Sequence, residues 1–369
     1  MGESRLHKLS ELGQSIWIDY LSRRMIHQGE LERLMREDAV VGVTSNPTIF
    51  QKAIAEGDAY DEQLREVLTQ EDDPKEVCLK LAVKDVQDAC DLLRGVWDGG
   101  HGQDGYVSIE VDPNFAYDTD ATIAEAQRLH ELVNRPNCFV KIPATEPGLP
   151  AIEEMIARGR SINVTLIFSL ERHQSVMEAY IRGVERLVEN GGDPATVHSV
   201  ASFFVSRVDT ETDKRLEAIG GEALALRGKL GIANAKLAYE NYLETFAGPR
   251  WDALAQKGAT KQRCLWASTS TKNPEYRDVL YVEELIGPET VNTMPEETLE
   301  AFQDHGRVAE TLTQDVAGAH KLFDDLRAAG IDYDDVVDTL EREGVQKFSD
   351  SFGELMDGIK AKRGELAPA

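Results

Sequence analysis

Eight short stretches of this chain are rich in strand-forming residues, and in four of them apolar and polar residues alternate with a period of two. Successive side chains of a β-strand point to opposite faces, so this period predicts strands. In the fourth stretch, Phe139, Lys141 and Pro143 would share one face, with Val140 and Ile142 on the other. The predicted strands occupy residues 15–20, 40–47, 106–111, 137–144, 162–168, 197–205, 263–268 and 290–295.

Segments with helical spacing of apolar residues follow these stretches. Ser169 stands where its hydroxyl would cap the first turn of one such helix. The glycine-rich loop 99–102 precedes a strand and opens no helix, so it predicts a plain turn without a phosphate cradle. The predicted helices occupy residues 21–38, 48–96 with breaks near Gly57 and at Asp73-Pro74, 119–133, 149–158, 170–189, 211–257 with a long run at 222–245, and further segments to about residue 362.

Alternation of strands and helices predicts a parallel sheet with right-handed crossovers. Eight such units predict closure into a single (β/α)8 TIM barrel of the α/β class, a fold that needs about 250 residues and tolerates insertions. The chain has 369 residues, and no linker rich in Pro, Gly and Ser divides it. We therefore expect one domain over residues 1–369, with extra helices at the termini and a C-terminal helical part at 300–369.

Polar residues occur at or near the C-terminal ends of six of the predicted strands. In a barrel of this kind the active site lies at that end. One buried polar group can be a satisfied core residue, but six converging groups are hard to explain by packing because each needs a partner. We expect a catalytic site that contains Asp19, Asn46, Glu110, Lys141, Thr165 and Ser202.

Lys141 is the most informative of these residues, because it is a lone cation among apolar neighbours. A charged side chain in such a place is costly unless it has partners or loses its proton. A neutral lysine amine is the nucleophile that forms Schiff bases with carbonyl substrates. The alternative is a lysine whose stem lies on the sheet while its amine reaches solvent or an acid.

The net charge of −26 argues against nucleic acid or an anionic membrane as a partner, since both bind clustered positive charge. The sequence shows no signal-peptide pattern and no apolar run long enough to span a bilayer. The glycosylation sequon at Asn163 falls inside a predicted strand, so we interpret it as chance. We expect a cytoplasmic protein whose four cysteines, which form no CxxC pair, are reduced and buried: Cys78, Cys90, Cys138 and Cys264.

Two long segments resemble the signatures of the transaldolase family. Residues 42–50, Gly-Val-Thr-Ser-Asn-Pro-Thr-Ile-Phe, match the first signature. Residues 139–148, Phe-Val-Lys-Ile-Pro-Ala-Thr-Glu-Pro-Gly, are similar to the second, which contains the Schiff-base lysine. Segments 108–112, 163–169 and 202–207 resemble the family in the same order along the chain.

The resemblance runs from about residue 10 to 300, and the chain length and the segment 271–274 are more similar to the longer bacterial branch than to the compact one. It implies transfer of a dihydroxyacetone unit through a lysine Schiff base, with no cofactor and no metal. The donor would be sedoheptulose 7-phosphate or fructose 6-phosphate, and the acceptor glyceraldehyde 3-phosphate or erythrose 4-phosphate. Such a step belongs to the non-oxidative pentose phosphate pathway, and relatives are often dimers, so a homo-oligomer is expected.

The resemblance also implies a role for each catalytic residue. Lys141 would attack the ketose carbonyl, and Glu110 would move protons through a water held with Thr165. Asp19 would act as acid and base on the hydroxyl whose deprotonation drives carbon–carbon cleavage. Carboxylates suit these steps because proton transfer needs positioned groups within hydrogen-bond reach.

Substrate binding is expected from Asn46, Asn163 and Ser202, which would hold hydroxyls of the dihydroxyacetone unit. Arg207 would bind the sugar phosphate through a charge-assisted pair, unless it forms a surface ion pair with Asp209 or Glu211 instead. Compact family members place a second phosphate-binding arginine after the seventh strand. The nearest cation here is Lys272, which offers a point charge and no planar fork.

Two other functions stay open at this stage. A fructose-6-phosphate aldolase on the same barrel would be favoured by a general-acid tyrosine at the mouth in place of Glu110 and its water. A non-catalytic barrel that binds sugar phosphates would form no covalent adduct with its ligand. A metal-dependent aldolase is disfavoured because the histidines show no ligand-like spacing. A dinucleotide enzyme is disfavoured because no GxGxxG follows a predicted strand.

Overall fold

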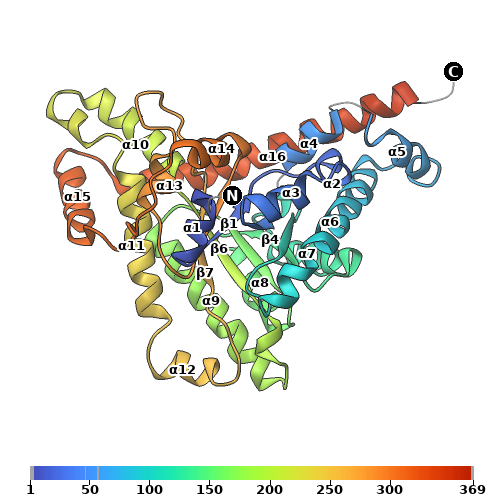
Figure 1. The fold of residues 1–369 in the computed structure, drawn as a ribbon, viewed down its shortest axis with the longest axis horizontal. Helices are drawn as coiled ribbons and strands as arrows, with labels where there is room; N and C mark the ends of the chain where they lie inside the picture. The colour runs from blue at the N-terminus through green and yellow to red at the C-terminus, as the bar shows by residue number, and fades with distance from the viewer. Residues whose placement is uncertain (1–3, 46, 56–57, 367–369) are drawn as a thin grey trace.

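Eight parallel strands form a closed barrel in which each strand pairs with its neighbours in chain order and β8 pairs with β1 (Figure 1). The computed structural model describes residues 4–45, 47–55 and 58–366. The predicted (β/α)8 barrel is therefore confirmed, and every predicted strand is present within a few residues. The strands are β1 (Gln14–Ile18), β2 (Val40–Val43), β3 (Tyr106–Glu110), β4 (Cys138–Pro143), β5 (Ile162–Ile167), β6 (Ser199–Phe204), β7 (Arg263–Ala267) and β8 (Thr290–Met294).

Helices surround the barrel, and α16 (Tyr333–Leu366) lies across one of its ends (Figure 1). Short 3-10 helices are η1 (Pro113–Phe115), η2 (Pro194–Thr196) and η3 (Gly221–Leu226). The first eight α-helices are α1 (Arg5–Glu11), α2 (Arg23–His27), α3 (Glu30–Glu37), α4 (Pro47–Ala55), α5 (Asp61–Val67), α6 (Pro74–Gly99), α7 (Thr119–Val133) and α8 (Gly148–Ala157). The others are α9 (Leu170–Glu189), α10 (Ser206–Ile219), α11 (Leu230–Thr245), α12 (Pro249–Ala255), α13 (Leu280–Glu284), α14 (Glu296–His305), α15 (Val316–Ala328) and α16 (Tyr333–Leu366).

The helix predictions hold at 119–133 and 170–189, where Ser169 accepts a hydrogen bond from the Arg172 N–H as expected of a cap. The predicted helix at 21–38 is wrong as one element, because Gly29 at φ +77° separates α2 from α3. The predicted run at 222–245 is also wrong in its first part. Gly228 at φ +69° ends the 3-10 segment, and the α-helix begins only at Leu230.

Aromatic side chains fill the barrel interior, and they come from strand positions whose side chains point inward. Trp17 on β1 and Phe139 on β4 have ring centroids 6.0 Å apart although their strands are not neighbours, so both rings point inward. Tyr106 stacks on Phe139 with centroids 3.9 Å apart. On β2, a Cβ added to Gly42 would lie 2.5 Å from the Trp17 ring, so only glycine fits there. The side chains between these positions, such as Val140, pack against the outer helices.

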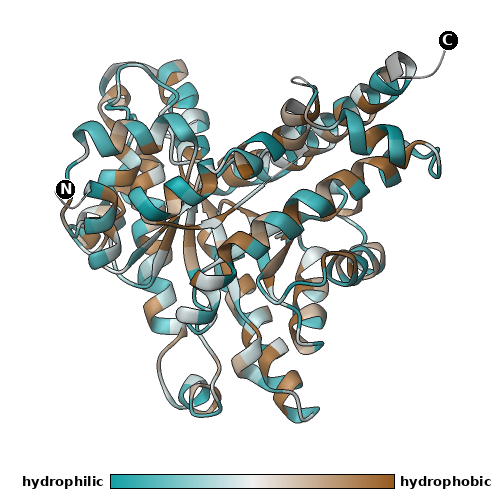
Figure 2. Ribbon diagram, turned by 45° about the vertical axis from the view of Figure 1, so that its right-hand side comes forward, coloured by the Kyte–Doolittle hydropathy of each residue, from teal (hydrophilic) through white to brown (hydrophobic). Residues whose placement is uncertain are grey.

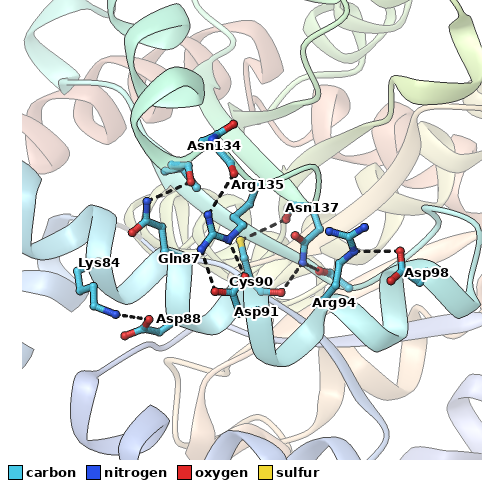
Figure 3. Close-up of polar contacts among 12 residues, drawn as sticks. Lys84, Gln87, Asp88, Cys90, Asp91, Arg94, Asp98, Asn134, Arg135 and Asn137 are labelled. Atoms are coloured by element: carbon cyan, nitrogen blue, oxygen red, sulfur yellow. Dashed lines mark hydrogen bonds and ion pairs between the residues drawn. The ribbon is translucent and has the colours of Figure 1, made fainter.

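The start of β4 is anchored to α6 by Asn137 (Figure 3). The side-chain Nδ2 of Asn137 donates to the backbone carbonyls of Cys90 and Gly105, each at 2.8 Å. The backbone carbonyl of Asn137 accepts from the Val107 N–H at 3.1 Å. Arg135 beside it forms a two-pronged ion pair with Asp91 at 2.6 and 2.9 Å. Buried backbone groups need partners, so these bonds fix where β4 begins relative to β3.

β5 carries a bulge near its C-terminal end, directly after Thr165. Its register with β6 shifts between Val164 and Ile167, and Leu166 has φ +59°. A bulge inserts one residue into the alternation and redirects the side chains beyond it. Leu166 therefore packs with the barrel interior, whereas Ile167 packs with the outer helices.

α16 runs across the C-terminal end of the barrel and finishes beside α4 (Figure 1, red). Its buried apolar positions recur at helical spacing and join the interior cluster. Figure 2 shows the hydrophobic colour gathered in the strands and on the inner sides of the helices, with hydrophilic colour on the outer faces. No helix in the described part of the chain is both long and apolar enough for a membrane span. All four cysteines are buried free thiols.

Candidate active site

The Lys141 amine lies inside the barrel, near the C-terminal end of β4. It is 3.3 Å from Glu110 Oε2, and it donates to the Ser45 carbonyl at 3.0 Å. The two charged side chains are only 7% and 3% exposed, so the amine does not reach solvent, and of the alternative that the sequence left open only the contact with an acid is present. Register explains the pair, since Glu110 on β3 stands directly opposite Lys141 on β4. Pairing offsets part of the cost of burying two charges.

Burial raises the pKa of the Glu110 carboxyl above its usual value, against the opposing effect of the Lys141 charge. Oε2 of Glu110 faces the Lys141 amine, and the buried Oε1 has no hydrogen-bond partner among the described residues. The Thr165 hydroxyl, on β5, is likewise buried and without a hydrogen bond to the described residues. Buried polar atoms of this kind are placed to take a water or a substrate hydroxyl.

Asp19 follows β1 and is held by the end of β2. The Thr44 hydroxyl donates to Asp19 Oδ1 at 2.9 Å and also contacts the Thr293 hydroxyl on β8 at 2.8 Å. The Asp19 N–H donates to the Met294 carbonyl at 2.8 Å. Three strand ends therefore fix the direction of this carboxylate at the barrel mouth.

A chain of hydrogen bonds crosses the barrel on the other side of Lys141. Ser202 on β6 donates to Asn163 Oδ1 at 2.7 Å, and Asn163 Nδ2 donates to the Ser108 hydroxyl at 3.2 Å. Asn163 stands opposite Lys141 in the pairing of β4 with β5. All three side chains are buried, so the chain holds Ser202 rigidly beside the lysine.

These groups surround a cavity of about 230 Å³ at the C-terminal end of the strands. Arg207 reaches it from the start of α10, with its guanidinium 5.0 Å from the centre of the Phe204 ring. Lys272 lines it from the loop after β7 and donates to the Ser270 hydroxyl at 2.7 Å. The sequence-predicted residues on the cavity wall are Asp19, Lys141, Thr165, Ser202, Arg207 and Lys272.

Arg207 does not form the surface ion pair that the sequence left open. Asp209 accepts from Tyr281 and Gly231, and Glu211 pairs with Lys214 and Arg215. Nη1 of Arg207 is buried and makes no hydrogen bond within the described part of the chain. Desolvation lowers the pKa of Arg207, yet a guanidinium stays charged at physiological pH. Arg207 is thus a half-buried cation on the cavity wall whose Nη1 has no partner among the described residues.

The remaining predicted residues have different outcomes. Glu110 does not line the cavity but contacts the Lys141 amine. Asn163 does not line it either, but its side chain accepts a hydrogen bond from Ser202, which does. Asn46 lies outside the described residues. The structure thus brings together the catalytic and substrate-binding side chains that the sequence predicts, as far as it describes them.

Comparison with known proteins agrees with this geometry. The family model for Transaldolase/Fructose-6-phosphate aldolase matches residues 16–359. The chain belongs to this family. It is 54% identical to a transaldolase of Frankia alni over 361 residues, 97% of each chain. It is 57% identical to a transaldolase of Acidothermus cellulolyticus over 355 residues, which cover 96% of this chain and 95% of the relative. It is 52% identical to Transaldolase 2 of Streptomyces coelicolor over 369 residues, which cover 99% of this chain and 98% of the relative.

The aromatic residues on the cavity wall help to separate the two activities in the family's name. The described residues that line it include Phe204 and Phe348 but no tyrosine. A tyrosine there would have favoured the aldolase, whereas the carboxylate of Glu110 lies 3.3 Å from the lysine amine. The relatives reported above are themselves named transaldolase.

Four residues of this transaldolase-family site received no role from the sequence. Thr44 and Ser45 lie within the first signature, and their contacts with Asp19 and Lys141 could have been suspected from that position. Phe204 is one of two adjacent phenylalanines at the end of a strand, a weak signal. Phe348 comes from α16, more than two hundred residues from the lysine, and no local pattern indicates that it reaches the cavity.

Proposed function

We propose that this protein is a transaldolase that moves a dihydroxyacetone unit between phosphorylated sugars, with Lys141 as the Schiff-base nucleophile. The observation that carries the proposal is the amine of Lys141, buried in the barrel 3.3 Å from the Glu110 carboxylate. Two further groups on the same cavity wall, Asp19 and Arg207, supply an acid/base and a cation for phosphate. A phosphorylated ketose would use all four groups.

Imine formation begins when the unprotonated amine of Lys141 attacks the C2 carbonyl of the ketose phosphate. The carbinolamine then loses its hydroxyl as water, with the proton supplied by Glu110. The raised pKa of Glu110 suits this role, because a carboxyl that keeps its proton nearer to neutral pH is a better general acid. A water bound between Glu110 and the unpartnered hydroxyl of Thr165 would carry the proton.

Carbon–carbon cleavage follows from the iminium. Asp19 takes the proton of the C4 hydroxyl, the C3–C4 bond breaks, and its electron pair moves to the iminium nitrogen to give an enamine. Thr44 supports this step by holding the Asp19 carboxylate at 2.9 Å. Sedoheptulose 7-phosphate would release erythrose 4-phosphate, and fructose 6-phosphate would release glyceraldehyde 3-phosphate.

Transfer reverses these steps on the acceptor. The enamine carbon attacks the aldehyde carbon of the acceptor, and Asp19 returns its proton to the new alkoxide. Water then adds to the iminium carbon with the help of Glu110, the carbon–nitrogen bond breaks, and Lys141 is freed. Every proton taken is given back, so the cycle needs no cofactor.

Substrate binding is assigned to the remaining polar groups. Ser202 and Asn163 hold hydroxyls of the three-carbon unit, together with Asn46 from the first signature. Arg207 binds the phosphate through its free guanidinium, and Lys272 adds a second positive charge on the same wall. A charge-assisted contact of this kind is the strongest that a phosphate can make with a side chain.

Three broader expectations belong to the same proposal. The chain would act as one domain over residues 1–369, supported by the packing of α16 on the barrel. It would work in the cytoplasm, which suits its four free thiols. Association into a homo-oligomer stays a prediction.

The test is an assay with fructose 6-phosphate in the absence and presence of erythrose 4-phosphate. A transaldolase forms sedoheptulose 7-phosphate with the acceptor and releases little dihydroxyacetone without it. An aldolase would release glyceraldehyde 3-phosphate and dihydroxyacetone continuously without an acceptor. Binding without any turnover would favour the non-catalytic barrel.

A further inference from the structure

The apolar face of α16 lies over the mouth of the barrel and contributes to the active-site cavity. Val336, Leu340, Gly344 and Phe348 are buried at intervals of four residues, so they form one stripe along the helix. A Cβ added to Gly344 would be 3.1 Å from the Leu166 side chain and 3.4 Å from the Phe168 ring. The helix therefore approaches the end of β5 as closely as its backbone allows.

Polar contacts fix α16 on both sides of this point. The Thr48 hydroxyl on α4 donates to the Ser351 hydroxyl at 2.7 Å, and the Ser349 hydroxyl donates to Asn114 Oδ1 at 2.7 Å. Further back, the Tyr333 hydroxyl donates to Asn234 Oδ1 at 2.7 Å. The helix is thus a fixed wall of the site, because it is tied to three different elements.

Phe348 is the residue of this wall that faces the lysine. The residue is 6% exposed, and the centre of its ring lies 6.0 Å from the Lys141 amine. It lines the same cavity as Thr165 and Ser202. A phenylalanine offers no hydrogen bond, so on this wall it excludes water, and its ring face attracts a nearby cation such as an iminium.

We propose that Phe348 is a substrate-contacting residue of the transfer reaction, whose ring closes the cavity over Lys141 and keeps water from the covalent intermediate until an acceptor binds. This rests on the proposed function. The competing reaction is hydrolysis without an acceptor: the enamine takes a proton at its carbon, water adds to the resulting iminium, the carbon–nitrogen bond breaks, and dihydroxyacetone leaves. An open wall would speed the water addition and leave the amine chemistry unchanged.

The experiment compares Phe348→Ala with the wild type in two assays. One measures release of dihydroxyacetone from fructose 6-phosphate without an acceptor, and the other measures transfer to erythrose 4-phosphate. The ratio of release to transfer should rise by about tenfold or more in the variant, the scale of a lost pocket contact. Leu340→Ala is the matched control, since it removes a buried side chain from the same stripe two turns away from the cavity. Its ratio should stay at the wild-type value.

Two further measurements keep the outcomes distinct. Phe348→Leu keeps an apolar side chain of lower bulk, so it decides the matter if the alanine variant does not fold, and its ratio should lie between the other two. Borohydride trapping of Lys141 with fructose 6-phosphate should succeed in every variant. An unchanged ratio with intact trapping, or an equal rise in the control, would overturn the role of Phe348. Failure of trapping in the wild type would instead overturn the proposed function.

Discussion

At the scale of single residues, the site places two acids and two cations where water has little access. Lys141 and Glu110 pair inside the barrel, whereas Asp19 and Arg207 face the cavity. An ion pair this deeply buried adds little to stability, because desolvation cancels most of the attraction. We therefore expect the pair to serve the proposed reaction rather than stability, and each of the four charged side chains to affect a different step of that reaction.

Glu110→Gln should slow the formation and hydrolysis of the imine. The amide keeps the shape of the side chain but cannot donate the proton for dehydration, so kcat should fall by about 10²–10⁴, the usual contribution of a general acid or base. Rapid-quench measurement of imine formation would check this. A variant with full kcat would remove Glu110 from the proton path.

Arg207→Lys should weaken binding of the phosphate while the amine chemistry continues. Lysine lacks the planar fork of arginine, so KM for fructose 6-phosphate should rise by about tenfold or more. Turnover of unphosphorylated fructose, which offers nothing to Arg207, serves as the control and should change little. An equal loss with both donors would contradict the phosphate role.

Sequence alone predicted the polar residues of the site because they interrupt apolar strands at one end. The same reasoning could not place Phe348, since an apolar residue on a helix gives no signal of what it faces. The position of Ser45 in the first signature places it near the site, but its carbonyl as the acceptor for the Lys141 amine depends on how the loop after β2 turns.

At the scale of elements, the register of β4 determines whether Lys141 meets Glu110. A slip of one residue would turn Lys141 to the outer face of the sheet, among the helices. Asn137 prevents this by joining the start of β4 to α6 and to Gly105 before β3 (Figure 3).

Asn137→Ala should therefore destabilise the fold by about 2–4 kcal/mol, because it removes two buried hydrogen bonds to backbone carbonyls. Urea unfolding at constant pH would measure the loss. Arg135→Ala is the matched control, since its pair with Asp91 is largely exposed and should be worth less than about 1 kcal/mol. Equal effects of the two substitutions would contradict the anchoring role of Asn137.

The strands were predictable because strand-forming residues cluster in each of them, and the bulge in β5 left Asn163 and Thr165 on the predicted face. The helix boundaries were less predictable where glycines adopt positive φ, as at Gly29 and Gly228. Apolar spacing indicated that α16 is a helix, but its position over the barrel depends on distant contacts such as Gly344 with Leu166.

At the scale of the whole molecule, a buried carboxyl makes stability depend on pH. Asp209 joins three helices, because it accepts from Gly231 on α11 at 2.6 Å and from Tyr281 on α13 at 2.8 Å. Burial raises the pKa of Asp209 to about 7 in the folded chain, against about 3.9 in an unfolded one. Its contribution to stability is thus complete below pH of about 4 and is lost as the pH rises through 7.

Asp209→Asn should remove this loss, since the amide resembles the protonated acid. The melting temperature of the variant relative to the wild type should rise between pH 5 and pH 8, about where the linkage acts. Asp91→Asn is the control without a slope over this range, because Arg135 lowers the pKa of Asp91 and its linkage to stability therefore acts only at more acidic pH. If the melting temperatures of Asp209→Asn and the wild type instead differ by a constant amount over this range, that result would contradict titration of Asp209 there.

In the proposed function, the fold as a whole keeps the Lys141 amine buried, paired with Glu110 and on the same cavity wall as Arg207. The most direct measurement of that claim is reduction with borohydride in the presence of fructose 6-phosphate, followed by peptide mapping. A three-carbon adduct should appear on the peptide that carries Lys141, and Lys141→Ala, with its circular dichroism unchanged, should form none. An adduct on any other lysine, or none in the wild type, would contradict the account.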